Sequence, residues 1–308
     1  MKKGLLFSLA LTLLLGLAVT SFAQNEGVGA GAVFRDGVDA RALAMGGAYV
    51  AIADNYSASY WNPAGAAQVA GTATIGLMNT NKFGQGINYN YVAGVLKLGG
   101  FAVGGAFQGS SISGIEQFDA SGNQVGTVDD NEMVFVGTAA LDVAGIGYAG
   151  ANVKAYNHTL AGGSATGFGF DVGVLLTLDA LSVGIVAQDL GGTSLQWSNT
   201  PSNPTDVVPA VFRAGGAFNI VNDDGDKLVT AAAQFDFGGA ENVLRLGAEL
   251  TLPGTPIAVR AGAVKPDSAD FAFTAGAGLA LGNLKVDFAF LQNQVLGNSL
   301  VLSAEFAL

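Results

Sequence analysis

Hydrophobic and polar positions alternate along most of this chain in short segments. From residue 71 onward, turn-forming Gly, Asn and Asp residues divide the sequence into fourteen such segments. Each is near the ~9–11 residues that a tilted strand needs to cross a bilayer. The segments are 71–80, 85–98, 100–110, 131–142, 145–157, 165–178, 180–190, 207–220, 226–237, 242–252, 255–265, 269–281, 283–293 and 298–308.

Charged and large apolar residues occupy opposite positions of this alternation. In segment 242–252, Leu244 and Leu246 share one parity, while Arg245 and Glu249 share the other. The same rule holds in 165–178, 226–237, 283–293 and 298–308. Because successive side chains of a strand point to opposite faces, one face is apolar and the other polar. The pattern predicts an all-β protein, a transmembrane antiparallel β-barrel of about fourteen strands.

A soluble β-sandwich also has alternating strands and is the alternative. Its outer face would be densely polar, whereas here the polar-parity positions are mostly Gly, Ala, Ser and Thr. Half of the chain is hydrophobic, only 12% is charged, and 46 residues are Gly. After the first residues, no stretch approaches the roughly 18 consecutive apolar residues of a membrane-spanning helix. These observations favour the barrel.

The first 23 residues have the pattern of a secretory signal. Two Lys residues precede an apolar run over 5–19 and a small-x-small cleavage site at 21–23. Cleavage before Gln24 leaves 11 basic against 24 acidic residues, a net charge of −13, which excludes a basic nucleic-acid-binding surface. The chain has no Cys, which excludes disulfides, thiolate metal sites and a lipid-anchoring Cys.

Residues 41–65, RALAMGGAYVAIADNYSASYWNPAG, fit neither a strand nor a long helix, because Gly46-Gly47 and Pro63 interrupt them. Asn62 and Pro63 suit the N-cap and first position of a helix over 64–68. A barrel of fourteen strands is too wide for side chains alone to fill. We therefore expect three regions: a signal at 1–23, an N-terminal arm and hatch at 24–70 inside the lumen, and the barrel at 71–308. Within the second region, 24–37 should be an extended Gly-rich arm.

Turn composition predicts two different rims. Residues 222–225 and 253–254 have the composition of tight hairpin turns. Residues 111–130 and 191–206 are instead expected to be long polar loops. Outer-membrane barrels have short turns on the periplasmic side and long loops outside.

The stretch 40–65 resembles the N-terminal hatch of the FadL-like outer-membrane proteins, and is most similar to their PorV/PorQ branch. The residues that match are Arg41, Met45-Gly46-Gly47, Ala53-Asp54 and Tyr60-Trp61-Asn62-Pro63-Ala64. The later phrases LRLGAEL, AVRAGAV and KVDFAFL resemble the family's C-terminal strands. One departure is the final residue, Leu308, because such barrels commonly end on an aromatic residue.

The resemblance implies an outer-membrane protein of a diderm bacterium, surrounded by outer-membrane lipid and inserted by the barrel assembly machinery. It implies uptake of hydrophobic small molecules of the long-chain fatty acid type, with a lateral exit and a gating hatch. The hatch residues would be Arg41, Gly46, Gly47, Asp54, Trp61, Asn62, Pro63 and Ala64. In the PorV branch the barrel instead docks secreted proteins for type IX secretion. We expect a monomer.

Four charged residues in the later segments have lumen-facing parity: Arg213, Arg245, Glu249 and Arg260. A charge facing lipid at the bilayer midplane costs about 2–4 kcal/mol, so these side chains should point inward. They either form ion pairs that fasten the hatch to the wall, or one arginine meets an anionic headgroup.

No pattern of catalytic or cofactor-binding residues is present. His158 is the single histidine, no G-x-S-x-G motif accompanies it, and we expect it to be solvated. Residues 222–226 lack the frame of a calcium loop, and the G-x-G pairs are not at strand-to-helix junctions. We therefore expect no enzymatic activity, no metal and no cofactor.

Overall fold

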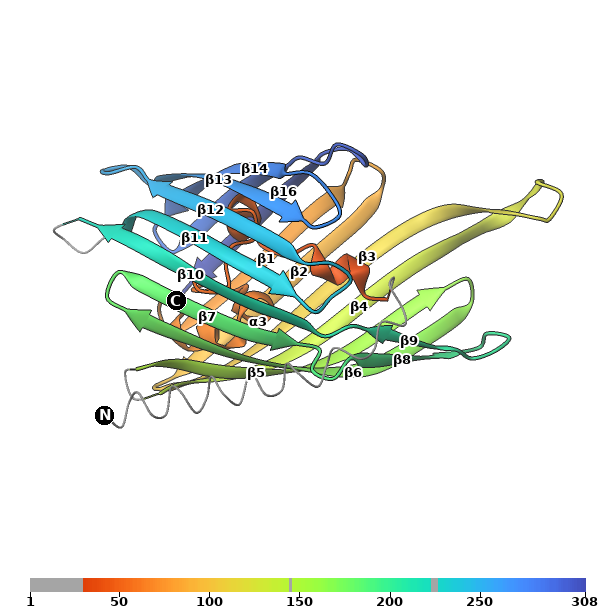
Figure 1. Ribbon diagram of the computed structural model, residues 1–308, viewed down its shortest axis with the longest axis horizontal. Coiled ribbons are helices and arrows are strands. Elements are labelled where there is room, and N and C mark those ends of the chain that lie inside the picture. Colours follow the sequence, from red (N-terminus) through yellow and green to blue (C-terminus); the bar gives the residue numbers. More distant parts are fainter. Residues whose placement is uncertain (1–29, 144–145, 223–226) are drawn as a thin grey trace.

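The computed structural model describes residues 30–143, 146–222 and 227–308. The expected signal, 1–23, lies outside these residues, as does most of the turn expected at 222–225. Fourteen antiparallel strands follow one another around a closed ring, which confirms the predicted barrel (Figure 1). They are β1 (Ala73–Lys82), β2 (Ile87–Leu98), β3 (Phe101–Phe118), β4 (Gln124–Asp142), β5 (Gly147–Leu160), β6 (Gly163–Leu178), β7 (Leu181–Gln188), β10 (Val211–Val221), β11 (Lys227–Phe237), β12 (Val243–Thr251), β13 (Ile257–Pro266), β14 (Ala272–Leu281), β15 (Leu284–Leu291) and β16 (Ser299–Ala307).

The last strand closes the ring on the first. Ile75 of β1 lies opposite Phe306 of β16. The terminal Leu308 continues this ladder, since its N–H donates to the Ala73 carbonyl at 2.8 Å. A non-aromatic last residue is therefore compatible with closure.

The outer face of the barrel is apolar, as the alternation predicts. On β6, Phe168 is 71% exposed, whereas Asp171 on the opposite parity is 1% exposed. On β12, Leu244 and Leu246 are exposed while Glu249 is buried. Large apolar side chains exposed all round a barrel indicate a lipid-facing surface. No helix among the described residues is long and apolar enough to span a membrane.

The two rims differ. Strands meet through short connections at one end, for example the turn at 252–255, where the Thr255 N–H donates to the Leu252 carbonyl. The opposite end carries the long excursions, but these are not loops as expected. β3 and β4 continue through 111–130 as a hairpin that projects far beyond the rim (Figure 1).

Residues 191–206 likewise contain strands: β8 (Thr193–Ser198) and β9 (Thr205–Val208) form a hairpin that pairs with the outer part of β6. The prediction failed because the polar composition of both regions hid their cross-strand pairing.

The N-terminal segment lies inside the barrel. It consists of short helical turns: η1 (Ala32–Arg35), α2 (Ala40–Ala44), α3 (Ala58–Trp61) and η2 (Pro63–Gln68). The Asn62 side chain accepts from the Ala64 N–H, so the predicted N-cap is confirmed. Residues 30–37, expected to be extended, instead include the turn η1, and Phe34 is buried against the wall residue Tyr156.

Candidate functional site

The inner wall of the barrel is shaped to accept the N-terminal segment, residues 30–70, which we call the plug. Seven strands carry a glycine where the plug passes. A Cβ added at any of these glycines would lie between 2.1 and 2.5 Å from a plug atom, too close for any side chain. They are Gly76, Gly150, Gly173, Gly184, Gly247, Gly262 and Gly276. Small residues in the plug thus pack against glycines in the wall.

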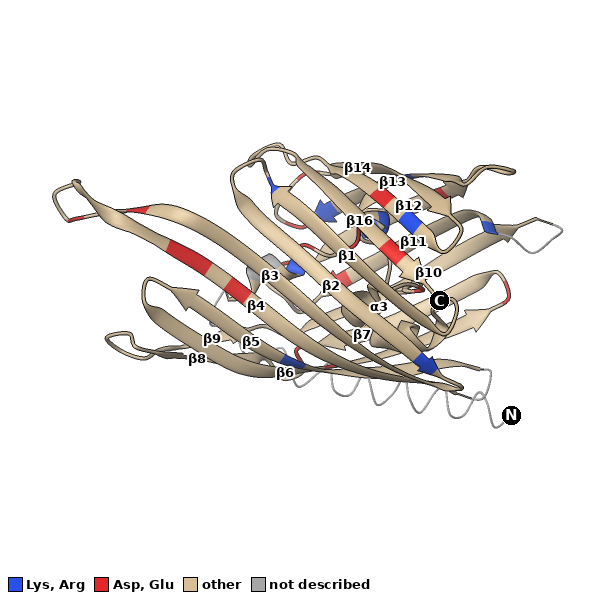
Figure 2. Cartoon of the chain, turned by 180° about the vertical axis from the view of Figure 1, so that it is seen from behind, with Lys and Arg blue, Asp and Glu red and all other residues tan. Residues whose placement is uncertain are grey.

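Arg41 joins the plug to the wall through a network of buried charges. Its guanidinium binds both Glu249 oxygens of β12, at 2.7 and 2.8 Å, and Asp54 of the plug at 2.6 Å. Arg260 of β13 contacts the same Glu249 at 2.6 Å and Asp287 of β15 at 2.7 Å. Four of the residues expected at the site therefore meet in one cluster: Arg41, Asp54, Glu249 and Arg260. Figure 2 shows acidic and basic residues on neighbouring strands of this wall.

The charges of this cluster also stabilise one another. Burial opposes the charge on Arg41, but Asp54 and Glu249 outweigh it and raise the pKa of Arg41 well above its usual value. For Asp54, burial would raise the pKa, but the adjacent Arg41 lowers it overall. Both groups are thus charged at neutral pH, so the plug is held by charge-assisted hydrogen bonds.

A second set of contacts holds the turn at Gly46-Gly47, where both residues have positive φ. Arg245 binds Asp236 at 2.8 Å and donates to the Gly46 carbonyl at 3.1 Å. Gln234 on β11 accepts from the backbone N–H groups of Tyr49 and Val50. Gly47 packs against the Trp61 ring, with no room there for a Cβ.

Asn62 connects two parts of the plug to the wall. Its Nδ2 donates to the Val50 carbonyl at 2.9 Å and to the Val174 carbonyl of β6 at 3.0 Å. Beside it, Pro63 packs over Gly173, and Ala64 over Gly150. Trp61 is 1% exposed and donates to the Val38 carbonyl at 3.0 Å. All eight expected hatch residues therefore lie in contact with the wall or within the packed plug.

Arg213 differs from the other wall arginines. It is 2% exposed, but its Nε and Nη1 have no hydrogen-bond partner among the described residues. Its Nε is 3.7 Å from Asp236, beyond hydrogen-bond distance, and its Nη2 makes one bond of 3.3 Å to the Tyr60 hydroxyl. The guanidinium lies over the Tyr60 and Trp61 rings. Arg213 thus has donor capacity that the protein itself does not use.

A cavity of about 530 Å³ lies between the plug and the rim of the long hairpins. Its wall includes apolar side chains such as Leu43 and Val264, and it ends on the plug at Gly46. Its basic lining residues are Arg35, Lys82, Arg213 and Arg245. Three acidic residues, Asp36, Asp236 and Glu241, also line it, so the cavity is a vestibule with apolar side chains and charged groups of both signs.

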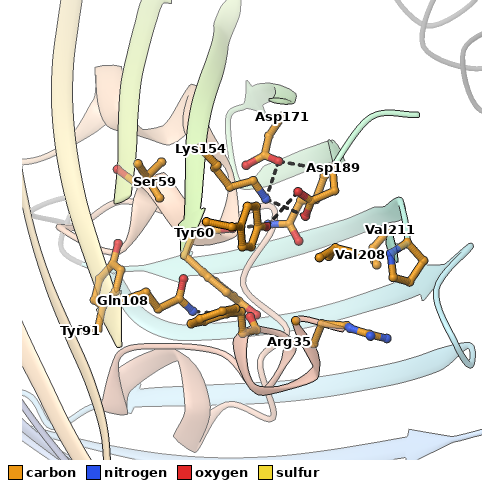
Figure 3. A pocket seen from close by; sticks show the side chains of 16 residues that line it. Arg35, Ser59, Tyr60, Tyr91, Gln108, Lys154, Asp171, Asp189, Val208 and Val211 are labelled. Carbon is orange, nitrogen blue, oxygen red and sulfur yellow. Dashed lines mark hydrogen bonds and ion pairs between the residues drawn. The ribbon is translucent and has the colours of Figure 1, made fainter. Parts of the chain in front are cut away.

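Beside the plug there is much less space. A second cavity, of about 30 Å³, lies between the plug and strands β2 to β7 (Figure 3). It holds a few water molecules at most, whereas a cavity of roughly 150 Å³ is needed for benzene. Tyr91, whose hydroxyl is buried and has no hydrogen-bond partner among the described residues, lines it. At this point the plug and the wall leave too little space for a molecule the size of benzene.

The sequence did not single out several residues that hold the plug. Asp39 is fully buried, has a positive φ of 72°, and accepts from Asn55 at 2.6 Å and from Ser303 of β16 at 3.1 Å. Burial, and secondarily Asp287, raise the pKa of Asp39. Ser59 of the plug bonds Thr138 of β4 at 2.9 Å. Alternation placed such wall residues inside, but could not show which plug residue each would meet.

The fold and this interior define a class of protein: a transmembrane β-barrel closed by an N-terminal plug. No family model and no curated protein matches the sequence. Solved structures share the fold at low sequence identity. The Ralstonia pickettii toluene transporter TbuX is 17% identical, with 88% of this chain and 98% of that chain covered and a TM-score of 0.63.

Two further structures have the same fold. For the P. putida toluene transporter TodX, identity is 13%, coverage is 89% of this chain and 99% of that chain, and the TM-score is 0.63. For a Pseudomonas aeruginosa FadL homologue, identity is 12%, coverage is 84% and 95%, and the TM-score is 0.58. The chain therefore has the fold of FadL-type channels over most of its length.

Proposed function

We propose that this protein is an outer-membrane channel that takes up hydrophobic small molecules through the vestibule, and that the plug is its gate. The observation that carries this proposal is the 530 Å³ vestibule that ends on a plug packed closely against the wall glycines. An empty barrel of fourteen strands would leak, and a permanently closed one would transport nothing. The plug must therefore move when substrate binds.

The way the plug is held supports movement. Its contacts with the wall include many hydrogen bonds and ion pairs, such as Arg41 with Glu249 and Gln234 with the backbone at Val50. Directional polar contacts can be exchanged for water as the plug shifts, at a lower cost than exposure of an apolar core. The FadL-type fold supports the same function, since the solved structures with this fold include toluene transporters.

Arg213 suggests the chemistry of the substrate. Once the plug has shifted, a hydrophobic molecule with a carboxylate could place its chain along the apolar residues of the vestibule and its headgroup at Arg213. The Nε and Nη1 of Arg213 are buried and have no hydrogen-bond partner among the described residues. The other wall charges, Arg245, Glu249 and Arg260, already bind the plug or each other. We therefore assign them to fastening the plug and Arg213 to the ligand. Decanoate is a suitable probe, with decane as its uncharged match.

The absence of Cys from the chain allows a direct test of gating. Ser59 and Thr138 face each other across the plug–wall interface, with their hydroxyl oxygens 2.9 Å apart. In the double variant Ser59→Cys/Thr138→Cys, oxidation should lock the plug and abolish decanoate uptake into proteoliposomes, and reduction should restore it. The two single variants control for loss of the hydrogen bond. Equal uptake by the oxidised and reduced double variant would refute gating by the plug.

A second function, docking of secreted proteins as in the PorV branch, is favoured by one observation. The outer hairpin of β3 and β4 over 111–130 carries four acidic residues and no basic one. A two-stranded ribbon gains little stability alone in water, so a partner protein with a basic surface would suit it. Replacement of 113–128 by a short turn separates the two functions. Loss of secreted proteins from the cell surface with normal uptake would support docking, whereas unchanged secretion would exclude it.

A further inference from the structure

Three side chains of ligand type converge at the base of the outer hairpin. Glu132 of β4 is paired opposite His158 of β5, and Asp130 lies two residues from Glu132 on the same face. One carboxylate oxygen from each acid and one ring nitrogen all lie within 4.8 Å of one another. The cluster is half-buried, so His158 is not the freely solvated residue that its sequence context predicted.

The contacts within the protein leave this cluster incompletely satisfied. His158 Nε2 lies 2.7 Å from Asp130 Oδ1. Among the residues that the structure describes, none donates a hydrogen bond to the Glu132 carboxylate. Lys82 attracts Glu132 electrostatically, but its ammonium is ion-paired with Asp36. Two carboxylates beside one imidazole repel each other unless a cation lies between them.

We propose that Asp130, Glu132 and His158 bind a divalent transition-metal ion of the Zn²⁺ type. The ion would be held by one imidazole nitrogen and two carboxylate oxygens, a set that Zn²⁺ accepts at about 2.0–2.2 Å from each atom. Ligand atoms around a tetrahedral ion are then roughly 3.4 Å apart. His158 Nε2 and Asp130 Oδ1, now 2.7 Å apart, would have to separate slightly to admit the ion, and ligand atoms that are now up to 4.8 Å apart would move closer together. Mg²⁺ and Ca²⁺ prefer six or more oxygen ligands, which this site does not supply. A fourth position stays open to water.

A tryptophan next to His158 should report metal binding through its fluorescence. The ring of Trp197 on β8 lies 5.0 Å from the His158 ring. Trp197 is itself held by a hydrogen bond of 2.7 Å from its Nε1 to Asp206 of β9. A metal bound at His158 would therefore lie close to a residue of the β8–β9 hairpin. Because the chain has only two Trp residues, a metal at His158 should be visible in the tryptophan fluorescence.

Cobalt titration of the purified, chelator-treated barrel tests the site. We expect one equivalent of Co²⁺ to bind with a visible absorption band, to quench the Trp197 fluorescence, and to be displaced by Zn²⁺. Glu132→Gln and His158→Asn should each weaken binding at least 10-fold, a loss typical for removal of a metal-site residue. Asp129→Asn is the matched control, because Asp129 is a neighbouring carboxylate that instead accepts from the Gly114 N–H at 2.9 Å.

The titration has one outcome that supports the metal site and two that overturn it. Saturable binding in the wild type and Asp129→Asn, with loss in Glu132→Gln, supports the site. An absence of saturable binding, or equal binding by wild type and Glu132→Gln, overturns it. Glu132→Gln preserves the size of the side chain, and the Glu132 carboxylate makes no hydrogen bond to the described residues. This variant therefore carries the test even if His158→Asn fails to fold.

Discussion

Gly262 offers a direct test of the close fit between plug and wall. A Cβ at this position would lie 2.2 Å from the Gly46 nitrogen and 2.4 Å from the Met45 carbonyl carbon. Both are backbone atoms, which cannot rotate away as a flexible side chain can. To reach an ordinary contact of about 3.4–4 Å the plug must retreat by roughly 1.2–1.8 Å, and such overpacking costs about 1–3 kcal/mol. Gly262→Ala should therefore lower the ratio of docked to undocked plug about 5- to 150-fold.

Ion conductance across a planar bilayer measures the undocked fraction, since an undocked plug opens the lumen. We expect Gly262→Ala to raise the leak while the barrel stays folded by circular dichroism. Gly137→Ala on β4 is the control, because a Cβ there meets nothing within 4 Å and Ala should favour the strand. A folded Gly262→Ala barrel with the same leak as Gly137→Ala would refute the argument that the wall glycines admit the plug.

Three further predictions concern the anchors of the plug. Asn62→Ala removes the hydrogen bonds to the Val50 and Val174 carbonyls and the cap of η2, so we expect greater permeability with an intact barrel. We expect the same of Pro63→Ala. Unchanged uptake and leak in both variants would contradict a hinge at Asn62 and Pro63. Glu249→Gln leaves buried arginines without their partner, at a cost of about 3–5 kcal/mol, which a lower midpoint of thermal unfolding should show. The pKa of Asp54 is lowered in the folded state, so the stabilising effect of Asp54 is present above its ordinary pKa of 3.8 and is lost as the pH falls through its lowered pKa. Conductance should therefore rise only in strong acid, and Asp54→Asn should remove this rise.

Much of the barrel followed from the sequence. Alternation placed Arg213, Arg245, Glu249 and Arg260 on the inner face, and the structure has all four buried or half-buried there. The reason is local: the side-chain period of a strand is two, so one residue facing lipid fixes the direction of its neighbours. The N-cap at Asn62 was predictable for the same reason, because a cap depends on residues two positions apart.

The alternation of polar and apolar residues could not predict the strands of the outer hairpins. Residues 111–130 lie outside the membrane region, so their strands carry no continuous apolar face. Their pairing depends on cross-strand contacts such as Ile115 with Val128, which periodicity does not show.

By itself, the sequence determined the class of fold, the number of strands in the ring and the inward direction of the charged wall residues, because each depends on neighbours in the chain. Only the tertiary structure decided which plug residue meets which wall residue. Arg41 and Glu249 are 208 positions apart, and Gly46 lies on Gly262 only because the ring closes around the plug. Within the part of the chain that the structure describes, it likewise decided that two nitrogens of Arg213 lack hydrogen-bond partners, and that Asp130, Glu132 and His158 converge. Such pairings depend on strand register and barrel closure, which no local pattern encodes.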